Sequence, residues 1–255
     1  MSTKLFDLTG KNVLITGSAR GLGLAIGTGL AEAGAQFIIS DVNAEGAEKS
    51  AAELRARGLK ATTCNFDVTS DEAVKNAVDK IEKEIGTLDI LVNNAGVNLR
   101  GALEEMDLGT WQKVIDINLT AVWRVSKFAA QRMIPRKRGK IINIASLMTF
   151  GGRPTTGPYT ATKTAIAGLT RAMTVEWAQH NIQINAIGPG YFLTDMTKPL
   201  ADNPEFDSWV KLRTPAKRWG LPKELVGLAI FYASEASDFV TGQVCYVDGG
   251  WTSNL

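Results

Sequence analysis

The first forty residues carry an apolar segment, a glycine-rich turn, a helix of small and apolar residues, and a second apolar segment. The apolar segments cover residues 11–16 and 36–40, and the turn after the first one reads Gly17-Ser18-Ala19-Arg20-Gly21-Leu22-Gly23. Two strands joined by one helix pair in parallel, because the helix returns the chain to the edge at which the first strand began. This order restricts the chain to folds built on a parallel sheet covered by helices.

The same alternation continues along the whole chain. Further apolar and β-branched segments predict strands at residues 61–67, 90–93, 140–145, 183–187 and 243–247. Helices are expected at residues 21–32, 44–57, 71–85, 108–133, 160–179 and 223–233. Strands that are apolar along their whole length are typical of sheets covered on both faces. We therefore predict a single α/β domain, residues 1–255, with a Rossmann-type doubly wound parallel sheet of about seven strands and helices on both faces.

The glycine-rich turn lies where a dinucleotide-binding unit needs it. Gly17 permits a tight turn, and Gly21 and Gly23 let the backbone and the opening helix approach a cofactor closely. The free N–H groups at the start of the helix would then face the pyrophosphate. A glycine-rich loop that only reverses the chain is the alternative, and the surrounding strands and helix favour the dinucleotide.

A second constellation lies in the middle of the chain. Tyr159 and Lys163 are one helical turn apart, so both side chains lie on one face of an expected helix. A nearby ammonium stabilises a phenolate and lowers the pKa of the tyrosine, which can then exchange a proton with a carbonyl or alcohol oxygen. Ser146 follows the segment 140–145, where its hydroxyl can hold the same oxygen. These residues predict ketone reduction or alcohol oxidation, although Tyr and Lys at this spacing are also common on exposed helices.

Composition excludes several other classes of function. The formal net charge of +2 is too small to indicate a nucleic-acid or membrane partner. His180 is the only histidine, and Cys64 and Cys245 are far apart, so neither a metal site nor a Ser–His–Asp hydrolase is expected. No signal peptide and no apolar stretch of membrane-spanning length is visible, and we interpret the cysteines as thiols of a reducing cytoplasm.

Several motifs together resemble the short-chain dehydrogenase/reductase family, almost from end to end. TGSARGLG at residues 16–23 resembles the family's cofactor turn, and NNAG at residues 93–96 resembles the motif that ends its fourth strand. Pro189-Gly190, followed by Thr194, resembles the loop that holds the nicotinamide. The positions of the family's catalytic residues are matched by Asn118, Ser146, Tyr159 and Lys163.

The resemblance implies a role for each of these residues. Asn118 would hold a water that relays protons between Lys163 and solvent, and Lys163 would also bind the nicotinamide ribose. Asp67 resembles the position whose carboxylate meets the adenine amino group, with capping of the next helix as the alternative. The expected cofactor-binding residues are Gly17, Ser18, Arg20, Gly21, Leu22, Gly23, Asp41, Asp67, Val68, Asn94, Ala95, Gly96, Tyr159, Lys163, Pro189, Gly190 and Thr194.

The second half of the chain resembles one part of the family more specifically, the gluconate 5-dehydrogenases and the related deoxy-ketogluconate dehydrogenases. The shared segments include MIPRKRGKIINIAS, INAIGPGYFLTDMT and GQVCYVDGGW. The resemblance implies a sugar-acid substrate that is oxidised or reduced at a secondary alcohol, at C5. It also implies that residues 191–221 cover the substrate and that the protein is a homo-tetramer.

The expected cofactor is NAD rather than NADP. Asp41 follows the second strand, where a carboxylate can accept hydrogen bonds from both ribose hydroxyls of the adenosine half and repel a 2′-phosphate. Arg20 argues the other way, because a basic residue in this turn often accompanies NADP in the resembled family. Asp41 also departs from the gluconate 5-dehydrogenases, which commonly carry a basic residue there and use NADP. We weigh Asp41 more heavily.

A sugar acid needs a cation for its carboxylate, and arginine binds carboxylates through two parallel hydrogen bonds. Arg100 and Arg153 are the candidates, with Arg100 favoured, and with Ser146 and Tyr159 they form the expected substrate site. Trp209 and Trp219 either stack on a sugar face or pack the loop. A polyol or 3-oxoacyl-type ketone reductase is the alternative enzyme. A non-enzymatic NAD-binding protein is the other alternative, and the intact catalytic set argues against it.

Overall fold

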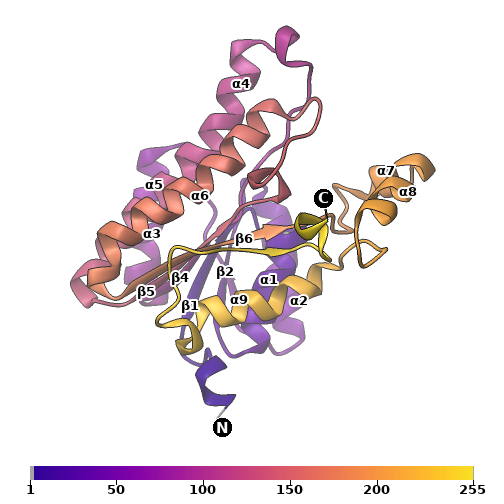
Figure 1. Ribbon diagram of the computed structural model, residues 1–255. Helices are drawn as coiled ribbons and strands as arrows, with labels where there is room; N and C mark the ends of the chain where they lie inside the picture. The colour runs from indigo at the N-terminus through magenta and orange to yellow at the C-terminus, as the bar shows by residue number, and fades with distance from the viewer. Residues whose placement is uncertain (1–2, 255) are drawn as a thin grey trace.

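The computed structural model describes residues 3–254, so residues 1–2 and 255 of the predicted domain lie outside the described residues. Within that range the strands form one parallel sheet in the order β3-β2-β1-β4-β5-β6-β7 (Figure 1). The order reverses between β1 and β4, and such a reversal places a crevice at the carboxyl ends of the strands. The strands are β1 (Asn12–Thr16), β2 (Gln36–Ser40), β3 (Ala61–Thr63), β4 (Leu88–Asn93), β5 (Gly139–Ile144), β6 (Ile182–Pro189) and β7 (Val244–Val247).

Helices cover both faces of this sheet, as the predicted fold class requires (Figure 1). Helices α1, α2 and α9 pack on one face, and α3, α5 and α6 pack on the other. No helix within residues 3–254 has both the length and the apolar character needed to cross a bilayer. The α-helices are α1 (Gly21–Glu32), α2 (Ala44–Ala56), α3 (Asp71–Lys80), α4 (Leu108–Ile115), α5 (Ala121–Arg136), α6 (Gly157–Trp177), α7 (Lys198–Ala201), α8 (Pro204–Arg213) and α9 (Val226–Ala233).

The apolar strands build two cores, one on each face of the sheet. Val13 and Ile15 point into the core shared with α1 and α9, whereas Leu14 points into the core shared with α3 and α5. All three side chains are fully buried, and burying a side chain of this size stabilises the fold by about 1.5–3 kcal/mol. This double burial explains why the strands read as continuous apolar runs rather than as alternating ones.

Three expectations about the elements are wrong in detail. The helix expected at residues 108–133 is divided into α4 and α5 by a π-helical turn, Asp116–Thr120. The third strand ends at Thr63 rather than at residue 67, because β2, its partner, ends at Ser40 and register pairing stops with it. The helix expected at residues 71–85 ends as α3 at Lys80 and continues as a π-helical turn, Ile81–Ile85.

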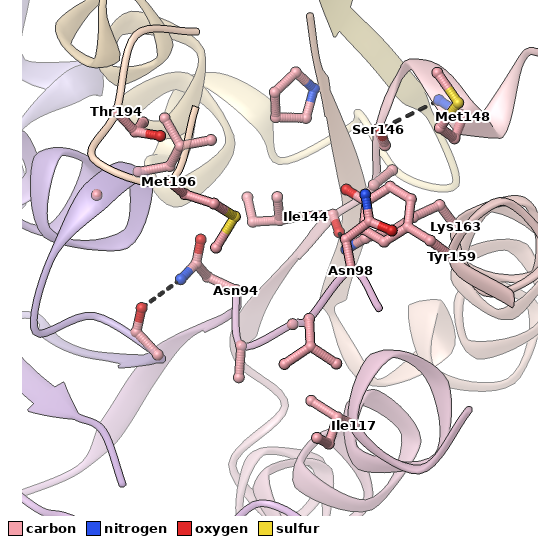
Figure 2. Close-up of a pocket in the computed structure, with 18 of the residues that line it drawn as sticks. Asn94, Asn98, Ile117, Ile144, Ser146, Met148, Tyr159, Lys163, Thr194 and Met196 are labelled. Atoms are coloured by element: carbon pink, nitrogen blue, oxygen red, sulfur yellow. Dashed lines mark hydrogen bonds between the residues drawn. The ribbon is translucent and has the colours of Figure 1, made fainter. Parts of the chain in front are cut away.

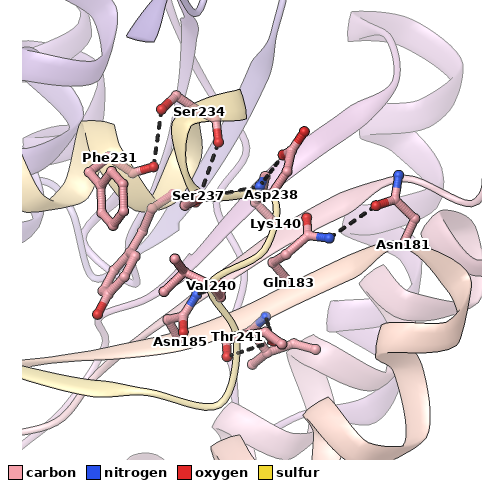
Figure 3. A network of polar contacts seen from close by, with 12 residues as sticks. Lys140, Asn181, Gln183, Asn185, Phe231, Ser234, Ser237, Asp238, Val240 and Thr241 are labelled. Atoms are coloured by element: carbon pink, nitrogen blue, oxygen red, sulfur yellow. Dashed lines mark hydrogen bonds and ion pairs between the residues drawn. The ribbon is translucent and has the colours of Figure 1, made fainter. Parts of the chain in front are cut away.

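The amino-terminal ends of β5 and β6 are tied to the loop that precedes β7 (Figure 3). Lys140 of β5 donates to Asp238 at 2.7 Å and to the hydroxyl of Ser237 at 3.3 Å. Asn185 of β6 donates to the carbonyl of Val240 at 2.7 Å. These contacts hold the loop before β7 at the end of the sheet opposite the crevice, which leaves the carboxyl ends of the strands free for a ligand.

Candidate active site

A cavity of about 990 Å³ opens at the carboxyl ends of the strands. Its walls come from the glycine-rich turn after β1, the ends of β2, β4, β5 and β6, the start of α6, and residues 194–200. In Figure 2, Ser146, Tyr159 and Lys163 lie together on one side of this cavity, and Asn94 and Met196 lie on the other. The cavity therefore brings together the two sequence constellations that lie more than a hundred residues apart.

The glycine-rich turn cannot accept larger residues at its tight points. Gly17 and Gly21 have φ angles of +61° and +62°, in the left-handed region that glycine adopts without strain. A Cβ on Gly17 would lie 2.8 Å from the Cα of Ala95, and a Cβ on Gly23 would lie 2.5 Å from Nδ2 of Asn94. The turn is thus packed directly against the residues that follow β4.

Asn94 and Thr16 hold this contact in place. The Asn94 side-chain amide donates to the carbonyl oxygens of Gly17 at 2.7 Å and Thr16 at 3.0 Å. The Thr16 hydroxyl accepts from the main-chain N–H groups of Asn94 and Ala95, both at 3.1 Å. These four hydrogen bonds fasten β1 to β4 at the point where the strand order reverses.

The turn and the start of α1 fit a dinucleotide. Arg20, the N-cap residue of α1, gives the helix no side-chain cap, so its first N–H groups are available to a pyrophosphate. A Cβ on Gly21 would meet no atom within 4 Å, because it would point into the space where the cofactor would lie. Asp41 lines the same cavity, and its carboxylate accepts from the N–H groups of Ala19 at 3.2 Å and Asn43 at 3.1 Å.

Asp67 lies on the cavity wall with Val68 and Thr69. Its Oδ1 accepts from the N–H of Thr69 at 2.8 Å and from the hydroxyl of the same residue at 2.7 Å, and these bonds lower the pKa of Asp67. The alternative role as a helix cap is wrong, because Ser70 is the N-cap of α3 and accepts from the N–H of Ala73. Asp67 therefore remains charged at the adenosine end of the cavity.

Ser146, Tyr159 and Lys163 converge, but their electrostatics differ from the sequence expectation. Burial raises the pKa of Tyr159, and a hydrogen bond with Ser146 opposes this rise. Burial also lowers the pKa of Lys163 to about 8. The expectation that Lys163 lowers the pKa of Tyr159 is wrong for this structure, because the Lys163 Nζ donates to the carbonyl of Ile144 at 2.6 Å and lies 5.7 Å from the centre of the tyrosine ring.

Asn118 is fully buried in the π-helical turn and does not line the cavity. Its Oδ1 accepts from the N–H of Val97 at 2.8 Å, and its Nδ2 donates to the carbonyl of the same residue at 2.8 Å and to the hydroxyl of Thr162 at 3.4 Å. The Asn118 side chain thus holds Val97, the residue directly after NNAG, against α6. A water relay at this position would have to use the main chain of the turn, because the side chain is already bound.

Two expected cofactor contacts also fall outside the cavity wall. Ser18 is completely buried, and its hydroxyl donates to the carbonyl of Ile15 at 2.7 Å. Gly23 packs against Asn94 inside the turn. Both residues shape the turn, and neither lines the cavity. The expected cofactor residues on the cavity wall are Gly17, Arg20, Gly21, Leu22, Asp41, Asp67, Val68, Asn94, Ala95, Gly96, Tyr159, Lys163, Pro189, Gly190 and Thr194.

Arg100 and Arg153 both line the cavity, with different surroundings. Arg100 is exposed, and its guanidinium donates twice to the hydroxyl of Thr155, at 2.8 and 3.0 Å. Thr155 has a φ of +68°, which is an unfavourable conformation for a β-branched residue. Arg153 is half-buried, and its guanidinium lies 4.3 Å above the ring of Phe206.

Residues 191–221 form a helical segment, which we term the cover, whose two ends pair with each other and whose far side is tied to the C-terminal segment. At its base, Gly220 donates to the carbonyl of Tyr191 at 2.8 Å, and Leu193 donates to the carbonyl of Gly220 at 2.9 Å. At its far side, the chain's last described residues hold it: Ala216 donates to the carbonyl of Gly249 at 3.0 Å, and Asn254 donates to the carbonyl of Arg213 at 2.9 Å.

Five rings pack together, four from the cover and one from the C-terminal segment. This aromatic cluster has Tyr191 at its centre, with ring centres 4.9–5.8 Å from those of the other four rings. Trp219 is 5% exposed and donates to Asp207 at 2.8 Å, so it packs the loop and does not stack on a sugar. Trp209 does not line the cavity either. The aromatic cluster consists of Tyr191, Phe206, Trp209, Trp219 and Trp251.

Sequence reasoning missed Tyr191 as a member of the cavity wall. The available signal was its position directly after Pro189-Gly190, in the loop already expected to reach the cofactor. Met148 and Met196 were also missed, and nothing in their local sequence distinguishes them from core residues. Within residues 3–254 no three His, Cys, Asp or Glu side chains gather in a way that could hold a metal ion.

The chain matches a family model described as enoyl-(acyl carrier protein) reductase over residues 17–252. It is 50% identical to the 5-keto-D-gluconate 5-reductase of Escherichia coli strain K12 over 246 residues, 96% of this chain and 97% of the other. It is 47% identical to the gluconate 5-dehydrogenase of Gluconobacter oxydans strain 621H, with 98% of each chain covered.

A solved structure of a gluconate 5-dehydrogenase from Burkholderia cenocepacia J2315, in complex with NADP and tartrate, is 46% identical. It superposes with a TM-score of 0.96 over 99% of each chain. The fold, the full-length similarity to these relatives and the family match agree. The chain belongs to the short-chain dehydrogenase/reductase family, the NAD(P)-dependent oxidoreductases that act on CH–OH groups.

Proposed function

We propose that this protein interconverts a sugar acid and its keto form at a secondary alcohol, as a gluconate 5-dehydrogenase does. The observation that carries the proposal is a single cavity in which Ser146 and Tyr159 lie opposite a dinucleotide-binding turn and beside two arginines, Arg100 and Arg153. Neither arginine forms an ion pair with a carboxylate of residues 3–254. A substrate carboxylate supplies the missing partner. The names of the relatives from Escherichia coli and Gluconobacter oxydans support the same chemistry.

In the proposed mechanism, Tyr159 takes the hydroxyl proton of the alcohol during oxidation and returns it to the ketone during reduction. Ser146, which hydrogen-bonds Tyr159, holds the same substrate oxygen as its charge changes. A bound nicotinamide supplies the hydride chemistry. Lys163, which also lines the cavity, would bind the nicotinamide ribose with its ammonium group. Asn118 keeps the main chain after NNAG at a fixed distance from α6.

We propose NAD as the preferred cofactor, although the relative from Burkholderia cenocepacia was crystallised with NADP. Asp41 is fixed on the cavity wall by two main-chain N–H groups, so it cannot easily turn away from an adenosine ribose. Its charge would face a 2′-phosphate directly. The turn, Asp67 and Val68, the NNAG residues, and Pro189, Gly190 and Thr194 would complete the cofactor site.

We also propose that residues 191–221 cover the substrate in a cytoplasmic homo-tetramer. Pro189 and Gly190 lead directly from the sheet into this cover, and Met196 lines the cavity. Leu108, Trp123 and Val175 leave large apolar side chains exposed on α4, α5 and α6, which supports burial against another subunit. Light scattering at micromolar concentration tests the assembly, and a monomeric mass would contradict it.

The function is tested by a substrate screen. Gluconate, 5-keto-gluconate, uncharged polyols and a 3-oxoacyl ester are each offered with NAD and with NADP, and turnover is followed by the nicotinamide absorbance. We expect the sugar acids to give the highest kcat/KM. Turnover of polyols or the 3-oxoacyl ester without turnover of any sugar acid would refute the proposal.

A further inference from the structure

Arg153 contacts the cover from the loop between Ser146 and Tyr159. Its guanidinium lies 4.3 Å from the ring centre of Phe206 and 5.5 Å from that of Trp209, both on α8. A guanidinium stacked by its flat face on an aromatic ring keeps the N–H groups at its edge free. Arg153 can therefore rest on the cover and still bind a carboxylate in the cavity.

Tyr191 is the second cavity-lining residue near Arg153. It lines the cavity and forms the centre of the aromatic cluster, so four neighbouring rings fix its orientation. Burial raises the pKa of Tyr191, while the charges of Arg153 and Arg100 act in the opposite direction. Tyr191 in turn acts to raise the pKa of Tyr159. Its hydroxyl is hydrogen-bonded to Arg153 and lies within electrostatic range of Arg100 and Tyr159.

Arg100 interacts with the loop that carries Arg153. Both of its hydrogen bonds go to the hydroxyl of Thr155, which is held in the left-handed conformation two residues after Arg153. The main-chain N–H of Gly101 also donates to the carbonyl of Thr155, at 3.1 Å. Arg100 therefore stabilises the strained bend of the loop that presents Arg153.

We propose that the carboxylate of the sugar acid binds to Arg153 and to the hydroxyl of Tyr191, with Phe206 and Trp209 of the cover as the platform that orients Arg153. Arg100 is a positioning residue in this arrangement. The inference rests on the proposed function and assigns its acid specificity to a subsite shared between the catalytic loop and the cover. Because the platform lies on α8, the cover is in its working position when Arg153 is oriented for the acid.

The test compares gluconate with glucitol, an uncharged polyol of the same carbon number, and uses tartrate as a competitive inhibitor. Arg153→Gln should raise the KM for gluconate and the Ki for tartrate about ten- to a hundredfold, because a charge-assisted pair is lost. Phe206→Leu, which keeps the charge and removes the platform, should raise both about two- to fivefold. Tyr191→Phe, which keeps the ring, should raise both about three- to tenfold.

In all three variants the loss of kcat/KM should be larger for gluconate than for glucitol, because only gluconate carries the carboxylate that the subsite binds. Arg57→Gln, a surface charge paired with Glu32, and Phe239→Leu, a fully exposed ring, are the matched controls and should change neither substrate. Arg100→Gln should affect gluconate and glucitol alike, since it disturbs the loop. Gluconate should change the tryptophan fluorescence of wild type, and Trp209→Phe should remove most of that change.

The outcomes separate the two proposals. If wild type turns over gluconate but Arg153→Gln leaves its KM and the Ki for tartrate unchanged, the subsite is refuted and the function stands. A loss that is selective for the acid in Arg100→Gln and absent in Arg153→Gln also refutes it, in favour of Arg100 as the anchor. If wild type accepts no sugar acid and tartrate does not inhibit, the function has failed and the subsite with it.

Discussion

The two halves of the cavity are built from different kinds of side chains and contacts. The cofactor half is made of glycines and short polar side chains whose hydrogen bonds run to the main chain, as in the contacts of Asn94 with Gly17. The substrate half is made of long side chains from three loops, with Arg153, Tyr191 and the aromatic cluster packed on one another. As the proposed cofactor site, the first half would use contacts common to all dinucleotides, whereas the second half can change its shape by single substitutions without disturbing the sheet.

The largest expected effect lies where the two halves meet. Tyr159→Phe removes only the ionisable oxygen, so kcat should fall about 10²–10⁴-fold while cofactor affinity stays nearly unchanged. Steady-state kinetics and fluorescence titration with the cofactor measure the two quantities. A variant that kept more than a tenth of wild-type kcat would show that Tyr159 is not the proton donor.

The next effect tests the rigidity of the cofactor half. In Gly23→Ala the new Cβ would lie 2.5 Å from Asn94 and 2.8 Å from the carbonyl of Gly17, so the turn must shift. Overpacking of this kind costs about 1–3 kcal/mol, and we expect a cofactor Kd about ten- to a hundredfold higher together with a lower Tm. Gly227→Ala in α9 is the matched control, because a Cβ there meets no atom within 4 Å. Equal behaviour of the two variants would mean that the turn is not tightly packed.

A smaller effect is expected for cofactor choice. Asp41→Ala removes a ribose acceptor and a charge that repels a 2′-phosphate, so the ratio of kcat/KM for NAD over NADP should fall about tenfold. Steady-state constants for both cofactors measure this ratio. A wild-type enzyme that already prefers NADP would contradict the argument from Asp41.

The smallest effect is a change in pH dependence. Burial lowers the pKa of Lys163 to about 8, so its charge is lost as the pH rises through about 8, and kcat/KM for ketone reduction should fall over the same range. Lys163→Arg keeps the charge, so this limb of the profile should disappear at a reduced overall rate. An unchanged limb in the variant would assign the titration to another group.

The lowered pKa of Lys163 also predicts how stability depends on pH. Between about 8 and the ordinary value of 10.5, the unfolded chain retains the Lys163 proton that the folded chain has lost. The free energy of unfolding contributed by this group therefore rises with pH across that window. Denaturant titrations of wild type and Lys163→Arg should differ in this slope, since the arginine stays charged in both states.

The parts that could be predicted from the sequence are those set by short-range rules. The apolar runs predict the parallel sheet because each strand is buried on both faces, and the glycines of the turn are required by backbone conformation and close contact. The break of the helix at Asp116–Thr120 could not be predicted, because Asn118 bonds to Val97, a residue of a distant loop. The direction of the pKa shift at Tyr159 was predicted wrongly for a similar reason, since it depends on burial.

The surroundings of the two arginines in the substrate half could not be predicted from the sequence either. The sequence offers Arg100 and Arg153 as cations near the expected site and favours Arg100. Their difference arises from Thr155 on one side and Phe206 on the other, which belong to segments some fifty residues away from their partners. Only the folded chain shows which arginine rests on an aromatic ring.

The attachment of the cover to the C-terminal segment has a practical consequence for anyone who produces this protein. The last described residues lie beside α7 and α8 in Figure 1, whereas the first described residues lie at the lower edge, below α9. Asn254 and Gly249 form hydrogen bonds with the cover. A purification tag fused after Leu255 would therefore perturb these contacts and change the affinity for the substrate. A tag placed before the first residue would not affect the cover, so kinetic constants from the two fusion proteins should not be pooled.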